Sequence, residues 1–184
     1  MLDLTKKVLP SKIEIEGSYY PIHTDFQYFI NLSLMLAKHE IKNVTDLDFM
    51  YIADKPADRQ KGIAALISFA FPKRPLPRPM PGGTDAIVFD YEQDADLIFA
   101  AFWQQYRIDI MDPGLNLHWY KFRAMLDGLQ NTRLNEIMSY RAYNEADNTD
   151  YKKSMQRLRN AWEIEMPLSD EEQAELDAFD AQFK

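Results

Sequence analysis

The chain contains no cysteine among its 184 residues. This absence excludes disulfide bonds, thiol nucleophiles and cysteine-ligated zinc, and it is typical of a reducing compartment. The three histidines are far apart, and His39-Glu40 is not followed by the second histidine of a zinc-binding helix. The longest near-apolar run, at 62–71, has ten residues, whereas a transmembrane helix needs roughly 20. Because the first ten residues also lack an apolar signal segment, we expect a soluble cytosolic protein.

Glycine is scarce, with six residues, and the glycine-rich motifs of catalysis and nucleotide binding do not occur. The stretch PGGTD at 81–85 lacks the lysine and the spacing of a phosphate-binding loop, and neither G-x-S-x-G nor G-x-G-x-x-G is found. The acidic run DYEQDAD at 90–96 spaces its carboxylates like a calcium loop. However, Ala95 replaces the turn glycine and Ala101 replaces the bidentate glutamate. We therefore expect no enzymatic activity, no cofactor and no metal.

Positive charge is in short supply, because 29 acidic residues outnumber 21 lysines and arginines and give a net charge of −8. Eight carboxylates and one lysine follow residue 162, so residues 163–184 carry −7 and residues 1–162 carry −1. An acidic end beside a near-neutral body disfavours binding to duplex nucleic acid, since phosphate repels it. The chain is nevertheless 46% hydrophobic and 13% aromatic, which is enough to form a buried core.

A β-hairpin and three helices are predicted before residue 72. The segment KIEIEGSYYPIH at 12–23 alternates apolar and polar residues around Gly17-Ser18, which is typical of a hairpin. Helices are then expected at about 24–40, 46–53 and 56–71, the first of them largely buried. A hairpin alone is marginal in water, so it must pack on these helices.

Five prolines follow at every second or third position of FPKRPLPRPMPGG. Proline removes backbone donors and fixes φ, so neither a helix nor an interior strand forms here. We predict an extended Pro-rich strap at 72–83 between an N-terminal lobe (1–71) and a C-terminal helical lobe (84–166). PxxP spacing with flanking cations also allows the alternative that the strap docks in an aromatic groove of a partner.

The rest of the chain follows helical periodicity, from a capping-box-like pair at Asp90 and Gln93 to an acidic terminal helix at 167–184. The predicted fold class is therefore mainly α, a multi-helix bundle with a small N-terminal β-hairpin. Nine apolar residues on the inward faces are assigned to the structural core: Trp119, Phe122, Leu126, Leu129, Ile98, Phe102, Tyr151, Leu158 and Trp162.

The stretch LNLHWYKFRAMLDGL at 115–129 places aromatic and basic residues side by side. At 100° per residue its apolar residues share one face, while Lys121 and Arg123 point to opposite flanks and Tyr120 lies off that face. A basic-aromatic platform for nucleic acid needs both kinds of group on one face. We predict a core helix that ends at a left-handed Gly128, with His118 as a boundary residue bonded to backbone or water.

The predicted helix at 149–162 carries four cations around its apolar face: Lys152, Lys153, Arg157 and Arg159. These are the candidate partner-binding residues. The acidic residues that follow residue 162 lie close in sequence to these cations. We therefore hypothesise that the acidic terminal helix either folds back on this basic face or occupies a site that a partner later takes. High salt should release such a contact if it depends on exposed charge.

The segments at 89–110 and 117–129 resemble a bacteriophage tail-module family, whose members are encoded next to the tape-measure gene in long-tailed phages and prophages of Gram-positive bacteria. The resemblance is strong over residues 85–162 and loose over the N-terminal lobe. Tyr120 departs from it, because a second tryptophan is expected there. The matching features are Phe89-Asp90-Tyr91, Asp94-Ala95, Ile98, Tyr106, Ile108-Asp109, Leu117-His118-Trp119, Lys121-Phe122, Gly128-Leu129 and Arg141.

The resemblance implies a tail-assembly-chaperone-like protein, which coats the long, helical tape-measure protein in the host cytoplasm while tube subunits polymerise around it. No catalytic residues are established for the family, so none are transferred. The implied partners are the tape-measure protein, a sister tail-assembly chaperone and the tail-tube protein, with homo-oligomers left open and no membrane contact. Two alternatives remain: a structural component retained in the virion, and a helical nucleic-acid-binding protein that uses the four cations.

Overall fold

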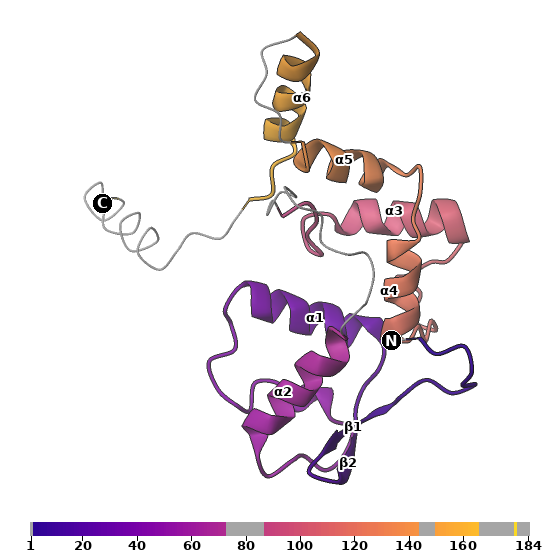
Figure 1. Ribbon diagram of the computed structural model, residues 1–184, viewed down its shortest axis with the longest axis vertical. Helices are drawn as coiled ribbons and strands as arrows, with labels where there is room; N and C mark the ends of the chain where they lie inside the picture. Colours follow the sequence, from indigo (N-terminus) through magenta and orange to yellow (C-terminus); the bar gives the residue numbers. More distant parts are fainter. Residues whose placement is uncertain (1, 73–86, 144–149, 166–178, 180–184) are drawn as a thin grey trace.

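The computed structural model describes residues 2–72, 87–143, 150–165 and 179. The Pro-rich strap beyond Pro72 and the acidic terminal helix, apart from Phe179, lie outside the described residues. The described chain is mainly α-helical with a small N-terminal hairpin, so the predicted fold class is confirmed (Figure 1). No helix in the described ranges is long and apolar enough to cross a membrane.

The hairpin pairs β1 (Lys12–Ile15) with β2 (Ser18–Pro21) in antiparallel register, with Ile15 opposite Ser18. Its two-residue turn is therefore Glu16-Gly17 and not the predicted Gly17-Ser18. Both turn residues have positive φ, 51° and 83°, as the right-handed twist of a tight hairpin requires. One face is covered by α2 (Arg59–Ala70), and Ile13 and Ile15 are buried.

Helix α1 (Phe26–Ala37) begins where the Asp25 side chain accepts a hydrogen bond from the Gln27 N–H, at 3.0 Å. The predicted helix at 46–53 is a short 3₁₀ helix, η1 (Asp48–Met50). Helix α2 starts at Arg59, three residues later than its predicted start at Pro56, because Asp58 caps it by accepting from the Lys61 N–H. Side-chain acceptors thus set the first residue of both long helices.

Four helices follow: α3 (Ala95–Tyr106), α4 (Trp119–Asp127), α5 (Arg133–Arg141) and α6 (Asp150–Ala161). Thr132 and Asn135 cap α5 reciprocally. Figure 1 shows the hairpin, α1 and α2 at one end of the molecule and α3, α5 and α6 at the other, with α4 between them.

One hydrophobic core extends across both predicted lobes, since its buried residues come from both sides of the strap. The contact is aromatic: the Phe26 ring of α1 stacks on Phe122 of α4 with centroids 4.5 Å apart, and Phe29 stacks on Trp119 at 5.3 Å. Offset stacking of this kind contributes about 0.5–1.5 kcal/mol per pair beyond area burial. Five of the assigned core residues are buried: Trp119, Phe122, Leu129, Ile98 and Phe102. Leu126 is half-buried against them.

The aromatic and basic residues at the start of α4 also cap the last turn of α2. The Trp119 indole N–H donates to the Ala70 carbonyl at 2.8 Å, and Arg123 Nη1 donates to the same oxygen at 2.8 Å. The Tyr120 hydroxyl donates to the Phe69 carbonyl at 3.1 Å. Tyr120 is therefore buried, contrary to its predicted place off the apolar face. The end of a helix leaves carbonyls without intrahelical partners, and α4 supplies the donors.

One further local prediction is wrong and another is half right. Gly128 has φ −86° and is not left-handed. The position is instead confined by a close approach, because an added Cβ would lie 3.0 Å from the Tyr106 hydroxyl. Asp90 Oδ1 accepts from the Gln93 N–H at 2.8 Å, as in a capping box, but the Gln93 side chain does not return to the Asp90 N–H. That N–H donates to Asp94 Oδ2 at 3.0 Å instead, and Gln93 bonds elsewhere.

Candidate partner-binding surface

A buried ion pair joins α3 to α5. Arg141 Nη1 lies 2.6 Å from Asp94 Oδ2 and Nη2 lies 2.9 Å from Oδ1, which is the bidentate geometry that guanidinium and carboxylate favour. Asp94 is 1% exposed and Arg141 6%. Both residues are in the string that carries the family resemblance, and periodicity had assigned a role to neither. With 47 positions between them, no local signal pairs them.

The remaining donors of Arg141 hold two other segments. Its Nη1 donates to the Val88 carbonyl at 3.1 Å, and its Nε donates to the Trp162 carbonyl at 2.5 Å, beyond the end of α6. Gln93 then clamps the next residues: its Nε2 donates to the Glu165 carbonyl at 2.7 Å, and its Oε1 accepts from the Glu165 N–H at 2.9 Å. The chain at 162–165 is thus tied to the start of α3.

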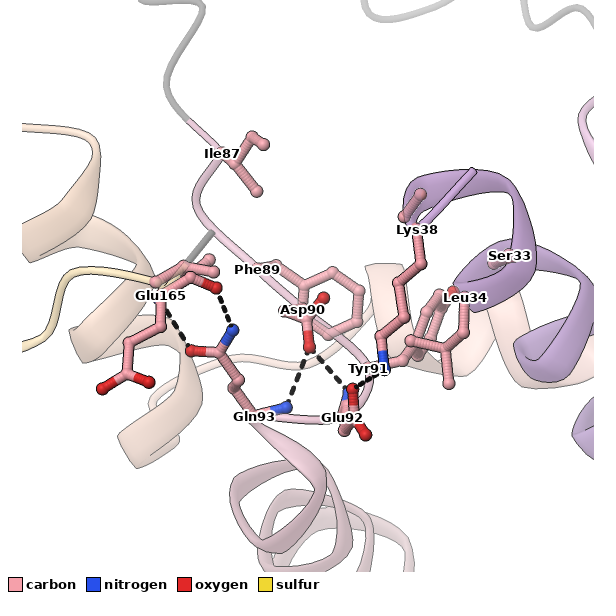
Figure 2. Close-up of a pocket in the computed structure, with 12 residues that line it drawn as sticks. Ser33, Leu34, Lys38, Ile87, Phe89, Asp90, Tyr91, Glu92, Gln93 and Glu165 are labelled. Carbon is pink, nitrogen blue, oxygen red and sulfur yellow. Dashed lines mark hydrogen bonds and ion pairs between the residues drawn. The ribbon is translucent and has the colours of Figure 1, made fainter. Parts of the chain in front are cut away.

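These ties leave an apolar groove with a volume of about 450 Å³. It lies between the last turns of α1, the chain at 87–93 that leads into α3, and the segment at 164–165 (Figure 2). We call it the α1–α3 groove. Six residues form its apolar walls: Leu34, Ala37, Ile87, Phe89, Tyr91 and Ile164. Helical grooves of this kind receive apolar side chains from a partner chain.

The rim of the α1–α3 groove carries more negative than positive charge. Asp90, Glu92 and Glu165 line it, against the single cation Lys38. The Lys38 ammonium lies 2.5 Å from the Glu92 carboxylate, and this hydrogen bond raises the pKa of Lys38 (Figure 2). Asp90 accepts from the Glu92 and Gln93 N–H groups, both at 2.8 Å. An apolar floor with an acidic rim suits an apolar segment that carries basic residues.

A second hollow lies on the other side of Phe89 and Tyr91, which line both. Its volume is about 530 Å³, and it lies among α4, α5 and Phe71 at the end of the N-terminal lobe. Burial raises the pKa of Tyr91 to about 12. The two hollows thus share one aromatic wall.

Helix α6 packs on α5, and none of its residues is fully buried. The assignment of Tyr151, Leu158 and Trp162 to the core is therefore corrected. Tyr151 is 69% exposed, whereas Leu158 and Trp162 are half-buried. The periodicity of the helix was right, but among the described elements α6 packs chiefly on α5, and part of its apolar stripe stays exposed.

The four cations of α6 differ in exposure. Lys153 and Arg157 are exposed, while Lys152 and Arg159 are half-buried. Arg159 Nη1 donates to the Tyr143 carbonyl at 3.3 Å, and Lys153 lies 3.8 Å from Asp150 on its own helix. The exposed pair is therefore the part of this set that a partner can reach directly. The terminal helix that would fold onto this face lies outside the described residues.

His118 caps α4. Its Nδ1 accepts from the Tyr120 N–H at 3.0 Å, and its Nε2 lies 2.9 Å from the Pro10 carbonyl. An Nδ1 that accepts requires the neutral tautomer with hydrogen on Nε2, which then donates to Pro10. Burial lowers the pKa of His118. Among the described residues, no group of three or more His, Asp and Glu side chains is placed to hold a metal ion.

The fold and this surface define a mainly α-helical protein with a buried ion pair and an acidic-rimmed apolar groove. A family model described as Bacteriophage Gp15 protein matches residues 5–164, and the chain belongs to this bacteriophage protein family. No curated protein and no solved structure matches the chain significantly.

Proposed function

We propose that this protein is a tail-assembly chaperone that binds the phage tape-measure protein in the host cytoplasm. Membership of a bacteriophage family supports the phage context. The observation that carries the binding role is the pair of apolar hollows on either side of Phe89 and Tyr91. No chemistry or cofactor is required of such a protein.

The client contact is a helix laid across the hollows. A tape-measure helix presents apolar residues at i, i+3, i+4 and i+7, and such a stripe fills neighbouring depressions on a helical surface. The acidic rim at Asp90, Glu92 and Glu165 favours clients with lysine or arginine beside the stripe. Lys153 and Arg157 on α6 form a second contact for acidic residues farther along the client. A sister chaperone and the tail-tube protein are further partners in this role.

Co-expression with the tape-measure protein of the same genome, followed by affinity pull-down and a solubility assay, tests the proposal. The native chain should keep the tape-measure protein soluble and co-elute with it. Ala37→Arg, which fills the α1–α3 groove, should reduce co-elution, whereas the matched control Ala100→Arg on the exposed face of α3 should not. Equal recovery with both variants, or a client that precipitates regardless, would reject this groove as the client site.

Two further experiments separate the alternatives. A chaperone should be absent from purified phage particles by mass spectrometry, and its presence in them at stoichiometric level would favour a structural tail component. A nucleic-acid-binding protein should retard DNA or RNA at low salt with an affinity that falls steeply as salt rises. We expect no retardation, because the exposed cations of α6 lie on a chain of net charge −8.

A further inference from the structure

The chain at 2–10, which we call the arm, exposes apolar side chains that its own fold does not cover. Leu4 is 98% exposed and Val8 79%, the highest values for large apolar residues in the described parts of the chain. Lys6 and Lys7 lie between them and are also exposed. Leu4 and Val8 lie on irregular backbone. Their apolar side chains are removed from water only when another surface covers them.

The α1–α3 groove matches the arm in chemistry. Its walls are apolar, and its volume of about 450 Å³ accommodates both side chains. Its rim carries three carboxylates against one lysine, and that lysine is already paired with Glu92. The arm supplies the opposite charge at Lys6 and Lys7, and Lys6 lies 3.4 Å from Asp3 of the arm itself in an exposed ion pair. Opposite potentials on two surfaces favour their encounter and set the register of the contact.

The fold prevents the whole arm, Val8 included, from filling the groove of its own molecule. The Pro10 carbonyl is hydrogen-bonded to His118 at the start of α4. The backbone of His118 in turn forms a β-bridge with Asp25, the residue that caps the start of α1. The groove lies at the other end of α1, at positions 33–38, which is roughly 12–20 Å away at 1.5 Å per residue. Val8 is two residues from Pro10 and reaches only about 7 Å. Leu4, six residues from Pro10, reaches about 20 Å. Because Val8 stops short of the groove, Leu4 and Val8 cannot both fill it in the same chain.

We propose that the arm of one copy of this protein fills the α1–α3 groove of a second copy. Leu4 and Val8 enter the apolar walls, and Lys6 and Lys7 meet the acidic rim. When both copies exchange arms, the contact is two-fold symmetric and closes as a dimer. The inference does not depend on the tape-measure protein. A client helix and the arm compete for the same groove, so client binding releases the dimer.

Sedimentation velocity of the full chain over a concentration series tests the exchange. The native chain should form a dimer that weakens as salt rises, because part of the contact is exposed charge. The double variant Leu4→Asp/Val8→Asp should weaken the dimer by at least about tenfold, since two apolar side chains no longer leave water. Met111→Asp, at a residue that is 69% exposed and outside both surfaces, is the matched control and should leave the dimer unchanged.

Mixing two variants identifies the contact. The arm variant has an intact groove but a defective arm, and the groove variant Ala37→Arg has an intact arm but a defective groove. Because neither variant has both surfaces of the contact, each alone should be monomeric. A mixture should restore one arm–groove contact and form a mixed dimer weaker than the native one. The circular dichroism spectrum and thermal midpoint of each variant, compared with Met111→Asp, establish that it is folded.

Three results would overturn the proposal: a native chain that stays monomeric throughout the series, a dimer that persists in the arm variant, or a mixture that stays monomeric. A labelled peptide of residues 2–10 provides a direct measurement. The peptide should bind saturably to the arm variant. It should not bind to a protein that carries Ala37→Arg in addition to the two arm substitutions. Failure of the tape-measure pull-down would leave these outcomes unaffected, so the two proposals can be rejected separately.

Discussion

Replacing Asp94 by leucine should destabilise the protein far more than any exposed ion pair does. Asp94 is 1% exposed and receives both terminal nitrogens of Arg141. Its loss leaves a guanidinium that is 6% exposed without its carboxylate. Removing one partner of a buried pair costs about 3–5 kcal/mol, because the remaining charge stays desolvated. The free energy of unfolding of small domains is about 5–15 kcal/mol, so the variant should lose a large part of it.

A double-mutant cycle completes the test. In it, Arg141 is replaced by methionine, alone and together with Asp94→Leu. Arg141→Met also removes the donors to the Val88 and Trp162 carbonyls, at about 1 kcal/mol each. The double variant carries no buried charge. It should therefore lose less stability than the sum of the two single variants, by about 2 kcal/mol or more.

Urea unfolding followed by tryptophan fluorescence measures all four proteins, with stability taken from the midpoint and slope. Lys38→Met, which breaks the exposed pair with Glu92, is the control and should shift the midpoint little. The reasoning is refuted if Asp94→Leu behaves like this control, or if the losses of the two single variants simply add. Either result would mean that the pair does not act as one desolvated unit.

Trp119→Ala should cost about 3–5 kcal/mol in the same assay, because Trp119 is fully buried and its indole caps α2; a loss below that of an exposed variant would contradict the core assignment. Tyr151→Ser should leave the thermal midpoint nearly unchanged, since the side chain is 69% exposed; a large drop would restore Tyr151 to the core. Burial lowers the pKa of His118, so the unfolded chain takes up the proton first as pH falls. The stability that neutral His118 contributes is complete above its unfolded pKa of about 6.5 and is lost as pH falls through the folded pKa. His118→Asn retains an acceptor for the Tyr120 N–H and should flatten the pH dependence of unfolding below that value; an unchanged slope would assign it to other groups.

Local chemistry in the sequence predicted the beginnings of most elements. The hairpin at 12–23, the helix after Asp25 and the helix after Thr132 all form, because turn backbones and side-chain acceptors act over two to four residues. The prediction for 115–129 holds in part. Trp119 and Phe122 are buried on the predicted face, since the period of a helix is fixed by its backbone, but α4 begins only at Trp119, so Leu115 precedes it.

Errors arose where a residue had a distant partner. Gln93 matches a capping box in spacing, yet its amide bonds Glu165, 72 positions away. Tyr120 lies off the helical stripe, yet it is buried. Its hydroxyl donates a hydrogen bond to the carbonyl of Phe69, 51 positions away. The stripe of α6 was identified correctly, but how much of it is covered depends on distant segments, chiefly α5 among the described elements. Periodicity gives the direction of a side chain and not what it meets.

By itself the sequence determined the mainly helical class, the N-terminal hairpin and the phage resemblance, since these depend on local patterns. Only the tertiary structure decided that one core takes residues from both 2–72 and 87–143, that Arg141 joins Asp94, and that an acidic-rimmed groove lies between α1 and the chain at 87–93. The physical reason is that burial and charge pairing depend on which distant segments meet, and this is settled when the whole chain packs.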